Sequence, residues 1–354
     1  MIGKLRILDE DSAIVMLGYA PDDIFKIQDI VKARNSFVAL VEGDLYEVVH
    51  YLDPRSPFKF TGYLDRNVYS RMAALAQART FPENALADLR WAAAILAFCQ
   101  IADVTFDYAS SIYELASSQG GGRADEEIKA FRIVDNSSTQ LIIDFATGKS
   151  SGIPKGAMAV IEEPNTFPPD TFVRRTNEFR LNYIFVLKIA ALARQQIDGL
   201  QKMMLLLEWM HDGFMFGSPA LHFANRYFSP TRFRRMLKGF SRQEIRNAAW
   251  DLTFIQMWRR NALKGLQANR PALLISGDTA LKDIAGRMTA ETQEEFERQL
   301  QEVWGKGSSA GREVFNKYCA LWDAAQRDPN RRDKVPDYNA QLRMIEEMEN
   351  TVFV

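Results

Sequence analysis

Four acidic residues lie where a folded α/β chain could use them together. Asp65, in the string YLD, and Asp278, in ISGD, each end a short apolar run that reads as a strand. Glu114 and Asp251 lie inside stretches whose apolar residues repeat with helical spacing. Ligands of open α/β sheets bind outside the carboxyl ends of the strands, so folding could gather these acids into one site.

Carboxylates gathered in this way favour a divalent cation. Two unit charges about 4 Å apart repel by roughly 4 kcal/mol at an effective dielectric constant of about 20. A bound cation turns this repulsion into attraction, and a ligand set made only of oxygen favours Mg²⁺ or Mn²⁺ over Zn²⁺. The three histidines are scattered and form no HExxH or paired pattern, so we do not expect histidine-based zinc chemistry.

Each acid also has a structural interpretation. Asp65 and Asp278 could cap the helices that follow them, because each directly precedes a helical stretch. Glu114 could lie on a solvated or salt-bridged helix face, and Asp251 could pair with an arginine of its own helix. Asp283, further along the helix that follows Asp278, is an additional candidate for which a solvated position is the alternative.

The segments that must position these acids alternate between strands and helices. We expect helices over NVYSRMAALAQA, 83–101 and 107–118 after the strand that ends in YLD. A capping box of Ser241 and Glu244 predicts the start of a helix over 242–264. RPALLISGD then predicts a buried strand, followed by a helix over TALKDIAGRM. This order of elements indicates an α/β fold.

The other segments are assigned from the same signals. Strand-like runs at 13–18 and 36–40, a helix opened by Pro21 and a hairpin over SFVALVEGDLYEVVHYL make a small α+β segment at the start. The runs LIIDF and AMAVI also read as short strands. The stretch 177–240 is mostly helical with broad apolar faces, and the tail from 290 onward is helical and rich in charge.

Four strings together resemble the PIN domain, a metal-dependent nuclease fold. YLDRN (63–67) is similar to the first-strand signature of the family, and IYELAS (112–117) to the helix that supplies an acid. AAWDLTFIQ (248–256) is similar to a later acid-bearing helix, and LLISGDTALKDIA (273–285) to the last strand and its Ser/Thr-x-Asp turn. The interval between the second and third strings is far longer than in a compact PIN domain, which implies an insertion.

The resemblance implies the fold class and a division of the chain. The expected fold is α/β, with a PIN-like core whose central, mostly parallel sheet is flanked by helices, plus a large helical insertion and a small N-terminal α+β segment. The implied parts are an N-terminal mixed segment (1–57), the first part of the core (58–118), a mostly helical insertion (119–240), the second part of the core (241–289) and a C-terminal helical tail (290–354).

The resemblance also implies a reaction, hydrolysis of phosphodiester bonds, with RNA favoured over DNA and with Mg²⁺ or Mn²⁺ lowering the pKa of a bound water. The implied metal ligands and catalytic residues are Asp65, Glu114, Asp251 and Asp278. Asn67 and Ser276 would orient these ligands through hydrogen bonds, with Asp283 in support. PIN domains serve in toxin, defence or RNA-processing roles, and the resemblance does not choose between these.

A basic and aromatic segment directly precedes the helix that contains Asp251. Residues 226–242 read RYFSPTRFRRMLKGFSR and contain no acid. The basic residues, which could neutralise phosphates of a nucleic acid, are Arg226, Arg232, Arg234, Arg235, Lys238 and Arg242. The interleaved Tyr and Phe residues could stack on unpaired bases. Alternatively, the aromatic residues are core and the arginines form a solvated or protein-contacting face.

Composition and charge narrow the function classes. A chain of 354 residues with 47% hydrophobic residues can bury a sizeable core, and a net charge of −1 provides no general attraction to nucleic acid or anionic lipid. Two distant cysteines, no signal sequence and no long apolar run favour a soluble cytoplasmic protein without a membrane partner. Two other functions stay open: a catalytically inactive PIN-like nucleic-acid-binding or regulatory protein, and a structural protein that docks a partner or a second copy through its helical insertion.

Overall fold

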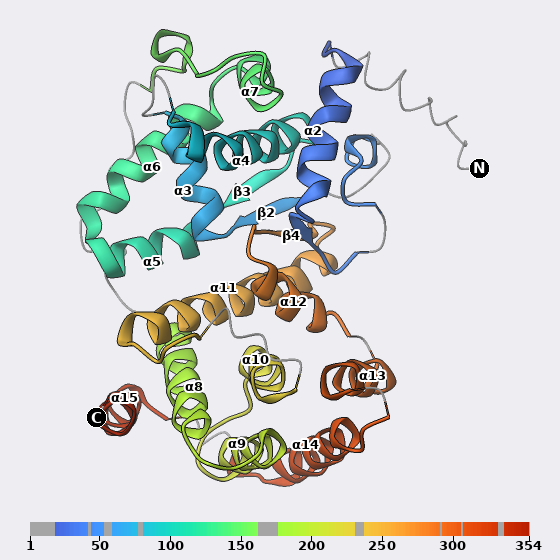
Figure 1. Cartoon of the computed structure of the whole chain (residues 1–354), viewed down its shortest axis with the longest axis vertical. Coiled ribbons are helices and arrows are strands. Elements are labelled where there is room, and N and C mark those ends of the chain that lie inside the picture. Colours follow the sequence, from blue (N-terminus) through green and yellow to red (C-terminus); the bar gives the residue numbers. More distant parts are fainter. Residues whose placement is uncertain are drawn as a thin grey trace. The chain divides into compact units, whose positions relative to one another are not determined.

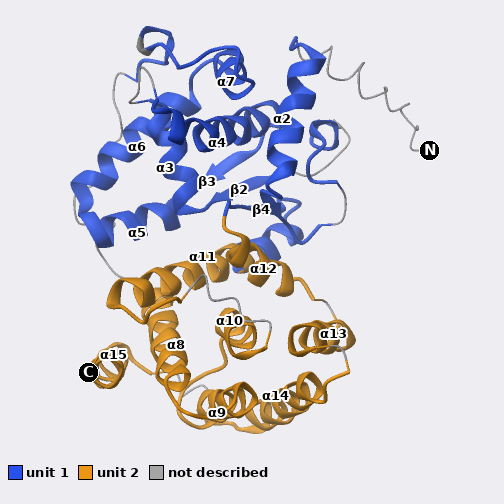
Figure 2. Cartoon of the chain, viewed as in Figure 1, with its two compact units in different colours: residues 1–174, 260–277 blue, residues 175–259, 278–354 orange. Residues whose placement is uncertain are grey.

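Figure 1 shows the computed structural model of the chain, which divides into two compact units (Figure 2). Unit 1 contains residues 1–174 and 260–277, and unit 2 contains residues 175–259 and 278–354. The structure describes residues 18–41, 44–52, 59–76, 81–161, 176–230, 237–290, 292–305, 307–331 and 336–353.

Unit 1 is built on a four-stranded sheet in the order β1-β4-β2-β3. Its strands are β1 (Phe37–Val38), β2 (Thr61–Leu64), β3 (Thr105–Asp107) and β4 (Ala272–Ile275). β2 pairs in parallel with both β3 and β4, whereas β1 pairs antiparallel with β4. All four residues of β4 are buried, as expected for a strand covered on both faces. The mostly parallel sheet predicted from sequence is therefore present.

Helices surround this sheet (Figure 1). They are α2 (Pro21–Ala33), α3 (Arg66–Leu75), α4 (Glu83–Ile101), α5 (Ala109–Gln119), α6 (Gly121–Asp135) and α7 (Thr139–Ala146). α4 packs against α2, α3 and α7, and α6 packs against α3 and α5. From Trp91 to Cys99 every residue of α4 is buried, so this helix forms the centre of the core of unit 1. The predicted helices after β2 are confirmed.

Two short runs of unit 1 that were predicted as strands do not form strands. LIIDF is helical and forms most of α7, whose buried residues contact the core with helical spacing; a short apolar run cannot by itself distinguish a strand from a helix. AMAVI forms no strand, since its first residue ends the 3₁₀ turn Lys155–Ala157 and the rest has no regular structure. The predicted strand at 13–18 falls, apart from Gly18, outside the described residues.

The predicted hairpin over SFVALVEGDLYEVVHYL is also wrong. Its first half forms β1, but β1 pairs with β4, and Val48–His50 forms a 3₁₀ turn. The buried Val48 N–H donates to Gln28 Oε1 at 3.1 Å, which ties this turn to α2. Pairing with β1 satisfies backbone groups of β4 that would otherwise form an open sheet edge.

Unit 2 is helical in the residues that the structure describes. It contains α8 (Asn177–Ala193), α9 (Gly199–Asp212), α10 (Ser218–Phe228), the greater part of α11 (Arg242–Gln267), α12 (Thr279–Arg287), α13 (Gln293–Trp304), α14 (Ala310–Arg327) and α15 (Tyr338–Val352). α10 lies inside the unit and packs against α8, α9, α12 and α13. α15 packs against α8, and α14 packs against α9 and α13.

The predicted capping box at the start of α11 is confirmed. The Ser241 backbone N–H donates to Glu244 Oε2 at 3.1 Å, and the Glu244 N–H donates to Ser241 Oγ at 3.2 Å. The bond from the Ser241 N–H and a second bond from Ser241 Oγ at 2.9 Å stabilise the ionised carboxylate, and they hold the pKa of Glu244 below its usual range. None of the helices within the described ranges combines the length and apolar character needed to cross a bilayer.

Candidate functional site

Asp65 lies at the carboxyl end of β2, in the middle of the parallel part of the sheet. Its backbone N–H donates to Ile275 O at 3.0 Å, which continues the parallel pairing of β2 with β4. The side chain is buried, with 5% of the residue exposed, and Oδ2 accepts a hydrogen bond from Ser276 Oγ at 2.8 Å. The carboxylate makes no capping bond to α3, although Asp65 occupies the N-cap position. Helix capping therefore does not explain this buried acid.

Ser276 has the supporting position that the sequence predicts for it. It follows β4 directly, it is fully buried, and its N–H donates to Ser36 O at 3.0 Å. Because β2 and β4 are parallel and Leu64 aligns with Ile275, the residues after these strands meet at one edge of the sheet. Strand register thus places the Ser276 hydroxyl against the Asp65 carboxylate.

Glu114 lies on α5, which is fixed to the same end of β2. Ser111 Oγ, one turn earlier on α5, donates to Leu64 O at 2.6 Å. Glu114 is partly buried, and burial raises the pKa of its carboxyl to about 8. The nearby Asp65 carboxylate raises this pKa further and Arg66 lowers it. The structure therefore brings two of the four predicted ligands, Asp65 and Glu114, within electrostatic reach of each other.

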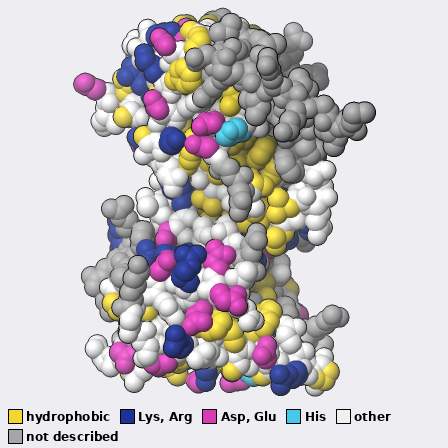
Figure 3. Space-filling view, turned by 90° about the vertical axis from the view of Figure 1, so that its right-hand side faces the viewer, with side chains coloured by type: hydrophobic (Ala, Val, Ile, Leu, Met, Phe, Trp, Pro, Cys, Tyr) yellow, Lys and Arg dark blue, Asp and Glu magenta, His cyan; other side chains and the backbone are white. Residues whose placement is uncertain are grey.

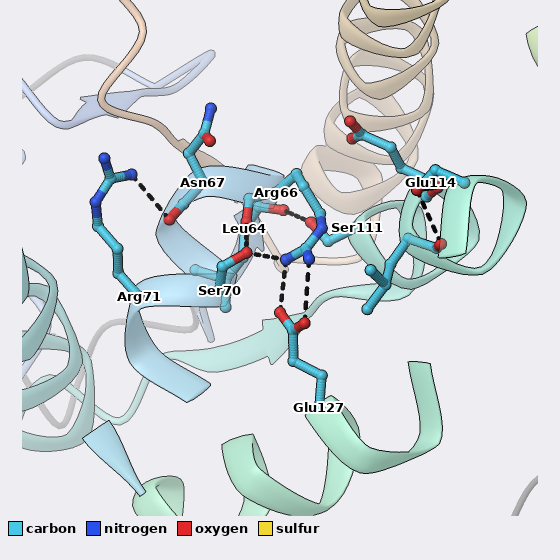
Figure 4. Close-up of polar contacts among 10 residues, drawn as sticks. Leu64, Arg66, Asn67, Ser70, Arg71, Ser111, Glu114 and Glu127 are labelled. Atoms are coloured by element: carbon cyan, nitrogen blue, oxygen red, sulfur yellow. Dashed lines mark hydrogen bonds and ion pairs between the residues drawn. The ribbon is translucent and has the colours of Figure 1, made fainter. Parts of the chain in front are cut away.

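An ion pair next to these acids was not predicted from sequence (Figure 4). Arg66 Nη1 and Nη2 donate to Glu127 Oε1 at 2.6 Å and Oε2 at 3.1 Å, and only 18% of the arginine side chain and 5% of the glutamate side chain are exposed. Arg66 also bonds the Ser70 hydroxyl. This two-point pairing fixes α3 to α6 directly after Asp65. In the sequence, the signal for this ion pair was Arg66, a basic residue directly after the acid that follows the strand.

Asn67 is less engaged than the resemblance implies. It is exposed, and its backbone oxygen accepts a hydrogen bond from Arg71 Nη1 at 3.1 Å. Figure 4 shows its side-chain amide directed away from the ion pair of Arg66 and Glu127. Among the hydrogen bonds of the described residues, none involves this amide, so its ligand-orienting role stays a prediction.

Asp107 is a third strand-ending acid, and sequence reasoning missed it. It ends β3 and aligns with Tyr63 of β2, so it lies at the same edge of the sheet as Asp65. Its Oδ1 accepts the Ala109 N–H at 3.0 Å, at the start of α5. The acid thereby helps to begin the helix that carries Glu114. The strand that it ends has only three residues and left no clear signal in the sequence.

The other predicted ligands, Asp251 and Asp278, belong to unit 2. Asp278 caps α12, because its Oδ1 accepts the Ala280 N–H at 2.7 Å and the Leu281 N–H at 3.1 Å. This is the structural role considered for it above. Asp251 is partly exposed in α11. Their role as metal ligands stays a prediction.

Asp283, the supporting acid, forms ion pairs within unit 2. Its carboxylate lies 2.7 Å from Arg226 Nε and 3.3 Å from Arg287 Nη2. Only 13% of the Arg226 side chain is exposed. The pairing neutralises both charges inside the unit, as in a structural ion pair. It gives Arg226 a role other than contact with a phosphate.

The rest of the basic segment is described only in part. Arg232, Arg234 and Arg235 lie outside the described residues. Lys238 is exposed, and Arg242 lies 3.4 Å from Glu349 with its guanidinium over the Phe353 ring. Figure 3 shows basic and acidic side chains intermixed on the face that it displays, in keeping with the net charge of −1.

The oxygen chemistry at the edge of the sheet fits a hard cation held by few protein ligands. Within the described residues, no three His, Cys, Asp or Glu side chains group closely enough to hold a metal ion by themselves. Mg²⁺ often keeps several waters and binds through one or two carboxylates plus substrate phosphates. Asp65 and Glu114 match that smaller requirement, because together they offer carboxyl oxygens from two neighbouring acids.

Comparison with known proteins identifies no relative of this chain. No protein-family model, no curated protein and no solved structure matches it. The function must therefore be argued from the chain's own residues.

Proposed function

We propose that the chain is a metal-dependent nuclease, an endoribonuclease that hydrolyses phosphodiester bonds on a PIN-like core. One observation carries the proposal: a buried acid at the carboxyl end of a central parallel strand accepts a hydrogen bond from a serine of the neighbouring strand and lies near a second acid of raised pKa. A carboxyl whose pKa is raised by burial and by a neighbouring carboxylate is typical of catalytic and metal-binding sites.

The sheet order supports the PIN-like part of the proposal. The strand that resembles the family's first strand, β2, lies between β3 and β4, and both are parallel to it. The residues that resemble the family's first acid and its Ser/Thr turn, Asp65 and Ser276, are hydrogen-bonded. Two of the four strings that carry the resemblance, YLDRN and LLISGDTALKDIA, are thus neighbours at one sheet edge.

In the proposed mechanism, Asp65 and Glu114 would hold Mg²⁺ or Mn²⁺, and the metal would supply Lewis acidity there. Ser276 donates a hydrogen bond to Asp65, which fixes the orientation of this carboxylate. Glu114, with a pKa of about 8, holds a proton at neutral pH and releases it when positive charge arrives. The Arg66–Glu127 pair keeps α3 and α6 in place around Asp65.

The proposal is tested by metal-dependent cleavage of single-stranded RNA and DNA. The wild type should cut RNA in Mg²⁺ or Mn²⁺ and lose this activity in EDTA. Asp65→Asn and Glu114→Gln should each lower cleavage by more than about 100-fold, since ligand loss exceeds the usual effect of losing a supporting residue. Preference for DNA would revise the substrate, not the site.

Matched controls lie in the same unit. Asp103→Asn changes an exposed acid that pairs with Lys59, at a left-handed position (φ 51°) that Asn also tolerates. Glu126→Gln changes a glutamate whose side chain is 67% exposed on α6. Both should cleave like the wild type. Equal activity of Asp65→Asn and Asp103→Asn would refute the proposal.

A second candidate is a PIN-like protein that binds nucleic acid without cutting it. The observation that favours it is that Asp278 and Asp283 are already engaged, one as a helix cap and one in ion pairs. RNA binding by the wild type without metal-dependent cleavage would support this candidate over the nuclease.

A further inference from the structure

Unit 2 contains a cavity that the nuclease proposal does not use. Its volume is about 260 Å³. The end of α8, the start of α9, the end of α10 and the segment before α11 enclose it. Its wall includes Gly199, Lys202, Tyr227, Leu237, Lys238 and Phe240. This size lies just below the range of about 300–1,000 Å³ typical of sites for drug-sized ligands, so it suits a smaller molecule.

The cavity wall carries positive charge. Lys202 and Lys238 both line it, and no acid is among the described residues of the wall. Lys202 Nζ donates to Ala193 O at 2.9 Å, at the end of α8, which fixes this ammonium group in place. Two acids lie close by. Asp198 caps α9 by accepting the Gln201 N–H, and the Glu244 carboxylate accepts the Ser241 N–H, a bond that lowers its pKa together with the nearby Lys238. The wall therefore attracts an anionic group.

The same wall offers aromatic surface. Tyr227 and Phe240 are both partly exposed and both line the cavity. The Arg194 guanidinium lies 5.6 Å from the centre of the Phe240 ring, which fixes the position of this ring. Aromatic faces beside basic groups are how proteins hold single bases of nucleotides.

Phe240 is also held in a strained backbone conformation. Its φ is 54°, in the left-handed region that bulky side chains rarely adopt. Such a conformation persists where the surrounding structure enforces it, often at ligand sites. Glycine or asparagine adopts this left-handed conformation more readily than phenylalanine. The position nevertheless carries Phe240, whose ring lines the cavity.

The cavity wall is rigid at the junction of α9 and α10. A Cβ atom at Gly199 would lie 2.0 Å from the Phe228 carbonyl oxygen, so the start of α9 contacts the end of α10 backbone to backbone. Close contact of this kind allows no side chain at Gly199. This contact fixes the start of α9 against the end of α10 on one side of the cavity.

We propose that this cavity binds a nucleoside phosphate, with its base against Tyr227 and Phe240 and its phosphate near Lys202 and Lys238. The ligand is either a free nucleotide or the phosphorylated end of an RNA chain, since both present the same chemistry. Binding here needs no metal and does not depend on Asp65 or Glu114. It can therefore succeed where the nuclease proposal fails, and the reverse.

Calorimetric titration in EDTA tests the proposal, with AMP, inorganic phosphate, adenosine and a short 5′-phosphorylated oligoribonucleotide as probes. We expect AMP to bind more tightly than either adenosine or phosphate. Lys238→Gln should weaken AMP binding about tenfold or more, as for the loss of a charged hydrogen bond. Lys317→Gln, a lysine of unit 2 outside the cavity wall that pairs with Glu208, is the matched control and should bind AMP like the wild type.

A second variant separates the base from the phosphate. Phe240→Asn removes the ring while keeping a residue that tolerates the left-handed backbone. It should weaken AMP binding and leave phosphate binding unchanged. Preference for the phosphorylated oligoribonucleotide over AMP would identify a chain end as the ligand, and the opposite order would identify a free nucleotide.

Two results would overturn the proposal. One is the absence of saturable AMP binding to the wild type. The other is equal AMP affinity in Lys238→Gln, Phe240→Asn and Lys317→Gln, with all three melting like the wild type. If Lys238→Gln fails to fold, Lys202→Gln takes its place, with the same expected loss.

Discussion

Asp65 is a buried carboxylate that its own helix does not use. An aspartate before a helix commonly accepts the first free N–H groups, as Asp278 does in α12. Asp65 instead accepts the hydroxyl of Ser276, and the acid nearby, Glu114, keeps a proton to about pH 8. Both aspartates precede a helix, but they have different partners. Asp278 is a cap, whereas Asp65 is a candidate for function.

The raised pKa of Glu114 predicts a pH-dependent stability. Its pKa rises from the usual 4.5 to about 8 on folding, so the folded state binds the proton more tightly. The free energy of unfolding should therefore fall as pH rises from about 4.5 to about 8, and this loss should be absent in Glu114→Gln. Urea unfolding at pH 5, 6.5 and 8 measures the difference, with Glu126→Gln as the control. Parallel curves for wild type and Glu114→Gln would show that the pKa is not raised.

The Ser276 hydroxyl should matter for both stability and cleavage. In Ser276→Ala the buried Asp65 carboxylate loses a donor, so the free energy of unfolding should fall by about 1–3 kcal/mol. Cleavage should fall roughly 10- to 100-fold, as for other residues that orient a metal ligand. Ser118→Ala, on α5, removes a hydroxyl that bonds only local backbone oxygens and serves as the control. Unchanged cleavage by Ser276→Ala would remove the orienting role.

At the scale of elements, α12 allows the charge of Asp278 to be separated from its capping role. Asn caps a helix about as well as Asp, whereas Ala does not. Asp278→Asn should keep the melting temperature and lose cleavage, if the predicted ligand role is correct. Asp278→Ala should lose about 0.5–2 kcal/mol of stability as well. Full cleavage by Asp278→Asn would leave Asp278 as a cap alone.

The turn between β4 and α12 requires a glycine. A Cβ atom at Gly277 would lie 2.7 Å from Cη2 of the buried Trp91, a ring fixed by its hydrogen bond to Ser36 Oγ. Gly277→Ala should therefore lower stability by about 1–3 kcal/mol. Gly286→Ala is the matched control, because nothing lies within 4 Å of a Cβ there and α12 should gain helix propensity. The melting temperature should fall in Gly277→Ala and rise in Gly286→Ala.

The elements also show where local patterns suffice. Long helical patterns predicted α4 correctly because its apolar residues repeat over many turns. LIIDF and the second half of the predicted hairpin are too short to fix their own structure. α7 becomes helical through its packing on α4, and β1 pairs with a strand that lies far along the chain.

At the scale of the whole molecule, residues distant in sequence complete each unit. Residues 260–277 return to unit 1 and supply β4, and with it Ser276. α6 and α7, which the sequence assigned to the insertion, pack in unit 1. α13 and α14, assigned to the tail, pack with helices of the insertion in unit 2.

Metal binding should be visible as a change in the stability of the whole protein. A ligand at 100 times its dissociation constant adds about 2.7 kcal/mol to the free energy of unfolding. Mg²⁺ should raise the melting temperature of the wild type and of Asp103→Asn, but not that of Asp65→Asn. The rise should be larger at pH 8.5 than at pH 6.5, because Glu114 must release its proton. An equal rise in Asp65→Asn would place the metal elsewhere.

The sequence by itself determined the long helices, the strands β2 and β4 that directly precede Asp65 and Ser276, and the candidate acids. These follow from periodicity, capping and turn residues, which act within a few residues of the chain. Only the tertiary structure decided that the Asp65 carboxylate bonds Ser276, that Glu114 holds a proton, and that Asp283 pairs with Arg226. Such outcomes depend on burial and on neighbours contributed by distant segments, and no local pattern encodes them.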